Sequence, residues 1–134
     1  KFLVKLHNAK EKAVRFRVTQ LIGRILEGMG EDMEVDDDLW EALQAACLMR
    51  ARDKLVPIRT MAAAAMARLQ TPPEADDACP IIAEYRRMMA LDTSASVREA
   101  ATAGIGITKG TLPDLVQRTR DTNKAVRGVA FKKL

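Results

Sequence analysis

The residues Asp-Thr-Asn-Lys-Ala-Val-Arg at 121–127 indicate the fold most clearly, because the chain repeats the layout of this stretch. Residues 53–59 (Asp-Lys-Leu-Val-Pro-Ile-Arg) and 92–98 (Asp-Thr-Ser-Ala-Ser-Val-Arg) share its Asp, its branched apolar residue and its final Arg. A fourth copy at 9–15 (Ala-Lys-Glu-Lys-Ala-Val-Arg) keeps Val-Arg but has Ala9 where the others have Asp. The four arginines are 44, 39 and 29 residues apart, a spacing typical of stacked helical repeats. Such stacks usually work as binding surfaces.

Apolar residues recur one position before each of these arginines and three and seven positions after it, which places them on one face of a helix. The members are Val14, Val18, Ile22; Ile58, Ala62, Met66; Val97, Ala101, Ile105; and Val126, Ala130, Leu134. The composition, 48% apolar but only 4% aromatic, also favours closely packed helices over a sheet. We therefore predict an all-α fold, a right-handed α-solenoid of antiparallel helix pairs with about three and a half repeats.

Local signals place the boundaries of these helices. We expect helices at 1–7, 12–27, 36–52, 57–69, 80–90, 96–105, 112–118 and 123–134. The spacing Ser96-x-x-Glu99 resembles a capping box and predicts the start of the sixth helix. The helices make one array over 1–134, with repeats at about 1–30, 36–70, 79–107 and 111–134. Neither end carries the polar outer face of a terminal repeat, so we expect a piece of a longer array.

The recurring Asp and Arg need a physical reason. The Asp falls in the turn inside a repeat, where we expect it to cap the second helix. The Arg lies inside that helix, and stacking brings it near the Asp of the next repeat, which predicts a structural ladder of charge-assisted bonds. The ladder residues are Asp53, Arg59, Asp92, Arg98, Asp121 and Arg127. The alternative is that the same arginines contact a ligand.

The net charge of +4 hides an uneven distribution. Residues 31–38 hold six carboxylates, and without them the other 126 positions carry +10. A basic array suggests a polyanion as partner. Four repeats with helices about 8–10 Å apart span close to one turn of duplex DNA. The candidate DNA-binding residues are Arg15, Arg17, Arg50, Arg52, Lys54, Arg86, Arg87, Arg118, Arg120, Lys124 and Arg127. Each alone can be a solvated charge, and the hypothesis concerns their alignment across repeats.

The sequence offers little for catalysis, a metal or a cofactor, and we predict none of them. His7 is the only histidine, expected to be exposed at a helix end, and it cannot form a metal cluster with the distant Cys47 and Cys79. The two cysteines are expected to be reduced thiols. No apolar run is long enough for a membrane span. Trp40 and Phe16 are expected in the core, and no aromatic ladder exists for stacking single-stranded bases.

The pattern Asp-x4-[Val/Ile]-Arg in the second helix of a pair is the HEAT-repeat pattern. A set of longer segments in a fixed order is more specific than this pattern, and it covers essentially the whole chain. They are Ala13-Val-Arg-Phe-Arg-Val18, Arg59 with Ala62 and Ala67-Arg-Leu-Gln70, Asp92 to Arg98, and Arg118-Thr-Arg-Asp121 with Ala125-Val-Arg127. In this order they resemble the N-terminal part of the G-type HEAT-repeat subunits of condensin I. One departure is Ala9, which puts the first rung of the ladder in doubt.

The resemblance implies a HEAT solenoid without an active site, which holds a segment of the kleisin subunit. It also implies sequence-independent binding of double-stranded DNA in a basic groove, indirect contact with the SMC subunits, and a role in mitotic chromosome condensation. The location implied is the nucleus and the chromosome, with a cytoplasmic pool. The alternative function is a HEAT-repeat scaffold that binds an acidic peptide or partner without touching DNA.

Overall fold

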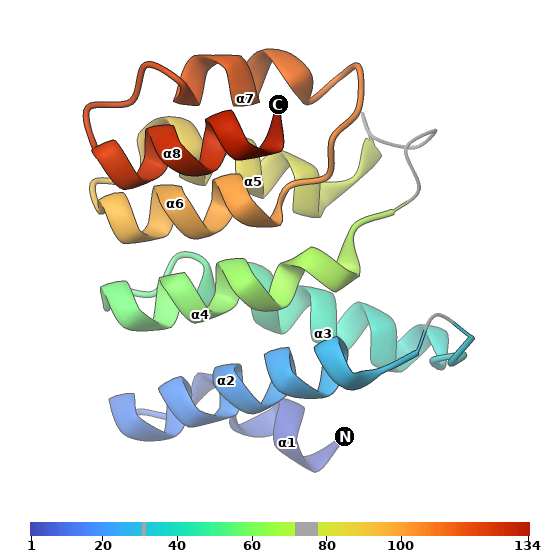
Figure 1. Cartoon of the computed structure of the whole chain (residues 1–134). Helices are drawn as coiled ribbons and strands as arrows, with labels where there is room; N and C mark the ends of the chain where they lie inside the picture. The colour runs from blue at the N-terminus through green and yellow to red at the C-terminus, as the bar shows by residue number, and fades with distance from the viewer. Residues whose placement is uncertain (31, 72–77) are drawn as a thin grey trace. The chain divides into compact units, whose positions relative to one another are not determined.

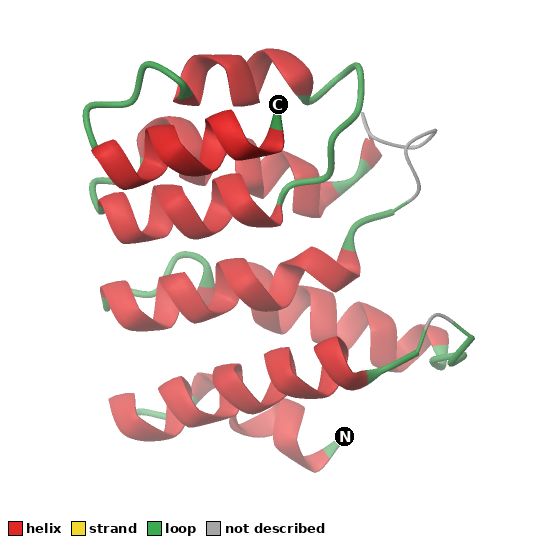
Figure 2. Cartoon of the chain, viewed as in Figure 1, coloured by secondary structure: helices red, strands yellow, loops and turns green. Residues whose placement is uncertain are grey.

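The regular structure of the chain is helical throughout the residues that the computed structural model describes, which are 1–30, 32–71 and 78–134 (Figures 1 and 2). The predicted all-α class is therefore confirmed. The chain divides into two compact units, Lys1–Leu69 and Gln70–Leu134. Each unit contains its own helix pairs and its own buried residues. In neither unit is a described helix both long and apolar enough to cross a bilayer.

Unit 1 is built around the contact between two long helices. Its elements are α1 (Phe2–Lys5), the 3-10 turn η1 (Leu6–Asn8), α2 (Lys12–Gly28), α3 (Asp37–Arg50), α4 (Val56–Met66) and the 3-10 turn η2 (Ala67–Leu69). Helix α4 packs against both α2 and α3. A Cβ added at Gly23 of α2 would lie 3.4 Å from the Cβ of Ala65 in α4, so the two helices approach closely because both side chains are small.

Unit 2 repeats the arrangement with shorter helices. Its elements are α5 (Pro80–Leu91), α6 (Ala95–Gly104), α7 (Leu112–Arg118) and α8 (Lys124–Lys133). Helix α6 packs against α5 and α8, and α7 packs against α8. Figure 1 shows α6 and α8 beginning at the same end of the unit. Tyr85 and Leu115 are completely buried between these helices.

The predicted apolar stripe is buried in nearly every copy. Ten of its twelve members are at most 4% exposed, while Val14 is 37% and Leu134 is 53% exposed. Both exceptions lie at helix ends. Val14 is in the first turn of α2. Leu134 follows the last helical residue of α8.

The start of α6 differs from the prediction. The helix begins at Ala95 with Ser94 as its N-cap residue, so the capping box expected at Ser96 and Glu99 is wrong. The cause is the repeated Asp, because the Asp92 carboxylate accepts a hydrogen bond of 2.9 Å from the Ser94 N–H. This local turn fixes an extended Ser94, and the helix starts at the next residue.

The exposure of three side chains also differs from what the sequence predicts. Trp40 and Phe16 are half-buried and do not belong to the core, and Trp40 lines an open cavity. His7 is half-buried where an exposed residue was expected. Burial, and then the positive charge of Arg50, lower the pKa of His7 below its ordinary value. His7 lies in η1, close enough to Arg50 to feel its charge.

Candidate nucleic-acid interface

A buried aspartate holds two arginines at the turn of unit 1. Arg15 Nε and Arg50 Nη1 both donate to Asp53 Oδ2, at 2.9 and 2.7 Å. The Leu55 N–H donates to Asp53 Oδ1 at 3.0 Å. Arg15 and Arg50 are only 8% and 7% exposed, so the cluster is part of the interior. It ties α2, α3 and the turn between α3 and α4 together at one end of the unit.

Unit 2 contains the same cluster at the corresponding positions. Arg98 donates to both carboxylate oxygens of Asp121, from Nε at 2.9 Å and from Nη2 at 3.1 Å. Arg118 Nη1 adds a third bond of 3.0 Å, and the Asn123 N–H a fourth of 2.9 Å. The spacing Arg-x-x-Asp at 118–121 matches that at 50–53. Each cluster therefore joins an Arg of one repeat to the Asp of the next.

Electrostatics follows from this geometry. Burial by itself raises the pKa of Asp53 and Asp121, but the bonds and charges of the paired arginines and the backbone N–H groups lower it below the ordinary value. The hydrogen bond to Asp121 raises the pKa of Arg98. The clusters thus stay charged, and hydrogen bonds accepted by the ionised carboxylates stabilise them.

The aspartates do not cap the second helices as the sequence suggested. The N-cap residues are Leu55, Ser94 and Asn123, each two positions after the repeated Asp. The carboxylate instead accepts the N–H of that N-cap residue, in a local turn that comes just before the helix. The capping prediction is therefore wrong by two residues, although the Asp does determine where the helix begins.

The repeated Arg has a second role that the sequence did not reveal. In every copy its Nη1 donates to the backbone carbonyl six residues earlier. The pairs are Arg15 to Ala9 O at 3.0 Å, Arg59 to Asp53 O at 3.0 Å, Arg98 to Asp92 O at 3.0 Å and Arg127 to Asp121 O at 2.7 Å. This bond needs no side chain on the acceptor, which explains why the first copy keeps its Arg without the Asp. The rung from Arg59 to Asp92 that the sequence suggested stays a prediction.

The candidate DNA-binding residues fall into distinct groups. Arg15, Arg50 and Arg118 are held inside the two clusters, and the burial of the first two disfavours phosphate contact. Arg127 donates to the carbonyls of Asp121 and Thr122. Two more candidates pair with carboxylates, Arg86 with Asp114 at 3.0 Å and Arg87 with Glu84 at 2.5 Å. Arg17 is exposed on α2 and donates to Gln20.

The remaining candidates are exposed and sit on the turns that the clusters hold. We call them the basic turn edges. In unit 1 the edge comprises Arg52 and Lys54, together with Lys10 and Lys12, which the sequence analysis missed although they lie in the fourth copy's turn. Arg15 brings these segments together, since it donates to Lys10 O at 2.7 Å as well as to Asp53.

In unit 2 the basic turn edge comprises the exposed Arg120 and Lys124. Beside them is a hollow of about 280 Å³. Its lining combines three arginines, Arg98, Arg118 and Arg120, with two carboxylates, Asp92 and Asp121, and with Ala90 and Thr122. The three positive charges exceed the two negative ones, which favours an anionic oxygen group. Over the residues with described positions, no group of His, Cys, Asp and Glu has the arrangement of a metal site.

Comparisons with known proteins identify the family. No family model matches the chain. Condensin complex subunit 3 of Homo sapiens is 40% identical over 133 residues, 99% of this chain, and that of Xenopus laevis is 38% identical over the same length. The chain is a relative of condensin complex subunit 3. It spans about an eighth of these relatives, 13% of each. The subunit of Schizosaccharomyces pombe is 32% identical over 129 residues, 95% of this chain and 14% of its own.

Solved structures agree with this relationship. A chain in the crystal structure of the S. pombe condensin Cnd3–Cnd2 subcomplex matches with a TM-score of 0.84 at 28% identity, over 97% of this chain and 16% of that one. An engineered protein matches with a TM-score of 0.63 at 20% identity, over 97% of this chain and 58% of its own, which supports the fold alone. The helix pairs of this condensin subunit 3 relative are thus those of a HEAT-repeat solenoid, as the sequence predicted.

Proposed function

We propose that the chain is part of a non-catalytic HEAT-repeat subunit of condensin that holds the kleisin subunit and binds double-stranded DNA. In this proposal the basic turn edges face the phosphates of a duplex, and the complex acts in mitotic chromosome condensation in the nucleus. Contact with the SMC subunits is indirect, and a cytoplasmic pool also exists. The relatives named condensin complex subunit 3 support the assignment to condensin. The similarity to a chain of the Cnd3–Cnd2 subcomplex supports a second subunit as partner.

The DNA proposal rests on one observation: both units contain the same arrangement of buried and exposed charges at a turn. In each, a buried aspartate with two arginines fixes a turn, and the exposed cations stand on that turn. The arginines inside the clusters are held by hydrogen bonds to the buried carboxylates. Lys54, Arg120 and Lys124 are exposed, so a phosphate can contact their positive charges. A rigid base also lowers the entropy cost of positioning these side chains.

The chemistry of the edges suits duplex DNA read without sequence preference. Lysine and arginine neutralise phosphates and release counterions, so the logarithm of affinity falls with the logarithm of salt by about 0.9 per phosphate engaged. The chain has only one Trp, one Tyr and three Phe, and Tyr85 is completely buried. Stacking on single-stranded bases is therefore not part of the proposal.

The test is a duplex titration with charge-reversed variants of unit 2. Arg120→Glu with Lys124→Glu reverses the basic turn edge, while Arg118 is left intact because it supports Asp121. The matched control is Lys109→Glu with Lys132→Glu, which changes the net charge equally. These two exposed lysines lie in the α6–α7 loop and in the last turn of α8, away from the turn.

The proposal predicts that only the edge variant loses most duplex affinity and that its salt slope becomes smaller by about 0.9 for each phosphate contact removed. The titration is run with and without the kleisin partner. Equal losses in both variants would contradict a localised interface, because they would reflect net charge alone.

The second candidate function is a scaffold for an acidic partner, and the hollow beside Arg98, Arg118 and Arg120 favours it, since a carboxylate fits there as well as a phosphate. The same two variants distinguish the functions. Loss of a protein partner with unchanged duplex affinity supports the scaffold, and loss of duplex binding with retained folding supports DNA.

A further inference from the structure

Unit 1 has two chemically opposite ends. Residues 25–49 contain eight carboxylates and no Lys, Arg or His, in a chain that carries +12 elsewhere. This acidic segment runs from the end of α2 through the loop to α3. The basic turn edge of unit 1 lies at the start of α2. The 17 residues of α2 separate the two ends by about 25 Å.

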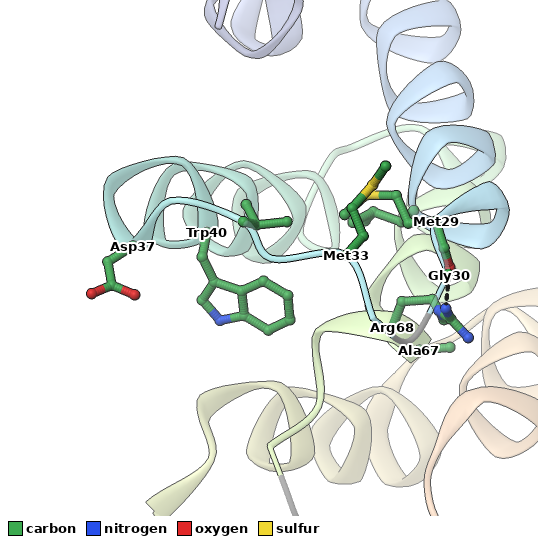
Figure 3. A pocket seen from close by; sticks show the side chains of 9 residues that line it. Met29, Gly30, Met33, Asp37, Trp40, Ala67 and Arg68 are labelled. Carbon is green, nitrogen blue, oxygen red and sulfur yellow. Dashed lines mark hydrogen bonds between the residues drawn. The ribbon is translucent and has the colours of Figure 1, made fainter.

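The acidic end contains a cavity of about 520 Å³. Trp40, Met29 and Met33 line it, along with Leu26, Gly30, Val35, Asp37, Ala67 and Arg68 (Figure 3). Figure 3 shows the Trp40 indole projecting from the first turns of α3, with Asp37 on the same helix pointing outward. Arg68 Nη2 donates to the Met29 carbonyl at 2.5 Å, which fixes the loop against η2.

The lining is suited to holding one apolar side chain. Trp40 is only half-buried, and Met33 is 61% exposed, so both offer apolar surface that the protein itself leaves uncovered. Tryptophan is enriched among the residues that dominate binding energy. Methionine is flexible and polarizable, and it adapts to side chains of different shape.

The rim determines what kind of segment carries that side chain. Asp37 lines the cavity. Asp32, Glu34 and Asp38 are exposed close to Asp37 in the sequence, in the loop and at the start of α3. Asp36 is excluded from the rim because its carboxylate accepts the Asp38 N–H at 3.1 Å and caps the helix. These four carboxylates outnumber the one cation among the described lining residues, Arg68, whose Nη2 donates to the Met29 carbonyl. This end of the unit therefore attracts positive charge and repels phosphate.

We propose that this cavity, lined by Trp40, Met29 and Met33, is a docking site for a basic protein segment with one large apolar side chain. The apolar side chain packs between Trp40 and Met33. The lysines or arginines on either side of it approach Asp37 and Asp32. The site is separate from the DNA interface proposed above, so either can fail without the other.

The probe is a synthetic heptapeptide, Gly-Lys-Lys-Leu-Lys-Lys-Gly, with a fluorescent label. Its controls replace the central Leu by Gly, or all four Lys by Glu. Because Trp40 is the only tryptophan, emission from the full chain reports directly on the cavity. The site predicts saturable binding of the Leu peptide with a change in Trp40 emission, weaker binding of the Gly peptide, and none of the Glu peptide. Equal affinity of the Leu and Gly peptides would overturn the proposal.

Variants of the chain locate the site through the anisotropy of the labelled peptide. Trp40→Ala should weaken binding by about tenfold or more, while Trp40→Phe retains most of the affinity because an aromatic ring remains. Asp37→Asn should weaken it by about threefold, and more at low salt. The matched control, Glu11→Gln, removes one exposed carboxylate at the other end of α2 and should change nothing.

Two results would reject this assignment. One is unchanged peptide affinity in a folded Trp40→Ala variant. The other is an equal effect of Asp37→Asn and Glu11→Gln, which would mean that the peptide responds only to overall charge. If Trp40→Ala does not fold, Trp40→Phe and Met33→Ser test the same contact. A loss of duplex affinity in these variants would assign the cavity to DNA and would also reject the proposal.

Discussion

Replacing Asp53 by Asn tests whether the buried cluster holds unit 1 together. The amide still accepts the Leu55 N–H, so the local turn is kept, but the negative charge between two arginines is lost. Arg15 and Arg50 are 8% and 7% exposed and would then share the interior without a counter-charge. Removing one partner of a buried ion pair costs about 3–5 kcal/mol.

Other hydrogen bonds of the two arginines keep the expected loss of stability near the lower limit of this range. Arg15 also donates to the carbonyls of Ala9 and Lys10, and Arg50 Nη2 to Asn8 Oδ1. These bonds remain in the variant, so we expect a loss of about 3 kcal/mol. That is a large part of the 5–15 kcal/mol typical of a domain.

The assay is urea unfolding followed by circular dichroism. With a slope of about 2 kcal/mol per molar urea, the midpoint of unit 1 should fall by about 1.5 M. The matched control is Asp114→Asn, which removes an ion pair whose side chains are about a third exposed, 33% for Arg86 and 32% for Asp114. This pair should be worth less than about 1 kcal/mol. If Asp53→Asn costs no more than Asp114→Asn, the cluster is not what stabilises the unit.

Three further predictions concern pH, packing and thiol chemistry. Because the pKa of each buried cluster aspartate is lowered on folding, their contribution to stability should be complete above about pH 4 and lost as pH falls through the folded pKa, as acid titration of circular dichroism would record. Gly104→Ala should destabilise unit 2 by about 1–3 kcal/mol, because the new Cβ would lie 2.5 Å from the hydroxyl of the buried Tyr85, whereas Gly128→Ala meets nothing within 4 Å and should raise the melting temperature. Burial raises the pKa of Cys47 to about 12, while hydrogen bonds to the sulfur outweigh burial and lower the pKa of Cys79. Mass spectrometry should therefore find Cys79 alkylated before Cys47 in the folded protein.

The helical architecture could be predicted from the sequence because its signal is repeated. Each Val-Arg helix carries apolar residues at fixed offsets, and burial follows them almost everywhere. Val14 is the exception: it continues the apolar pattern of α2, but it lies in the first turn of that helix and is 37% exposed.

The site could be predicted only in part, because the charge and spacing of residues do not show in which direction each side chain points. The sequence suggested an Arg and Asp from adjacent repeats, and the structure contains such bonds from Arg15 to Asp53 and from Arg98 to Asp121. The sequence also repeats Arg-x-x-Asp at 50–53 and 118–121, but this spacing alone does not show that Arg50 and Arg118 turn inward toward the same carboxylates. Trp40 looked like a core residue because its neighbours are apolar, but it lies at the first turns of α3, beside a loop.

We propose that exposed cations on the turns bind duplex phosphates, while the buried arginines only hold the turns. The most direct measurement is the duplex affinity of the chain across a series of salt concentrations, compared between Arg120→Glu with Lys124→Glu and Lys109→Glu with Lys132→Glu. We predict a weaker affinity and a shallower salt slope for the first pair alone. Identical slopes and affinities for both pairs would mean that the cations on the turns are not the residues that bind the duplex.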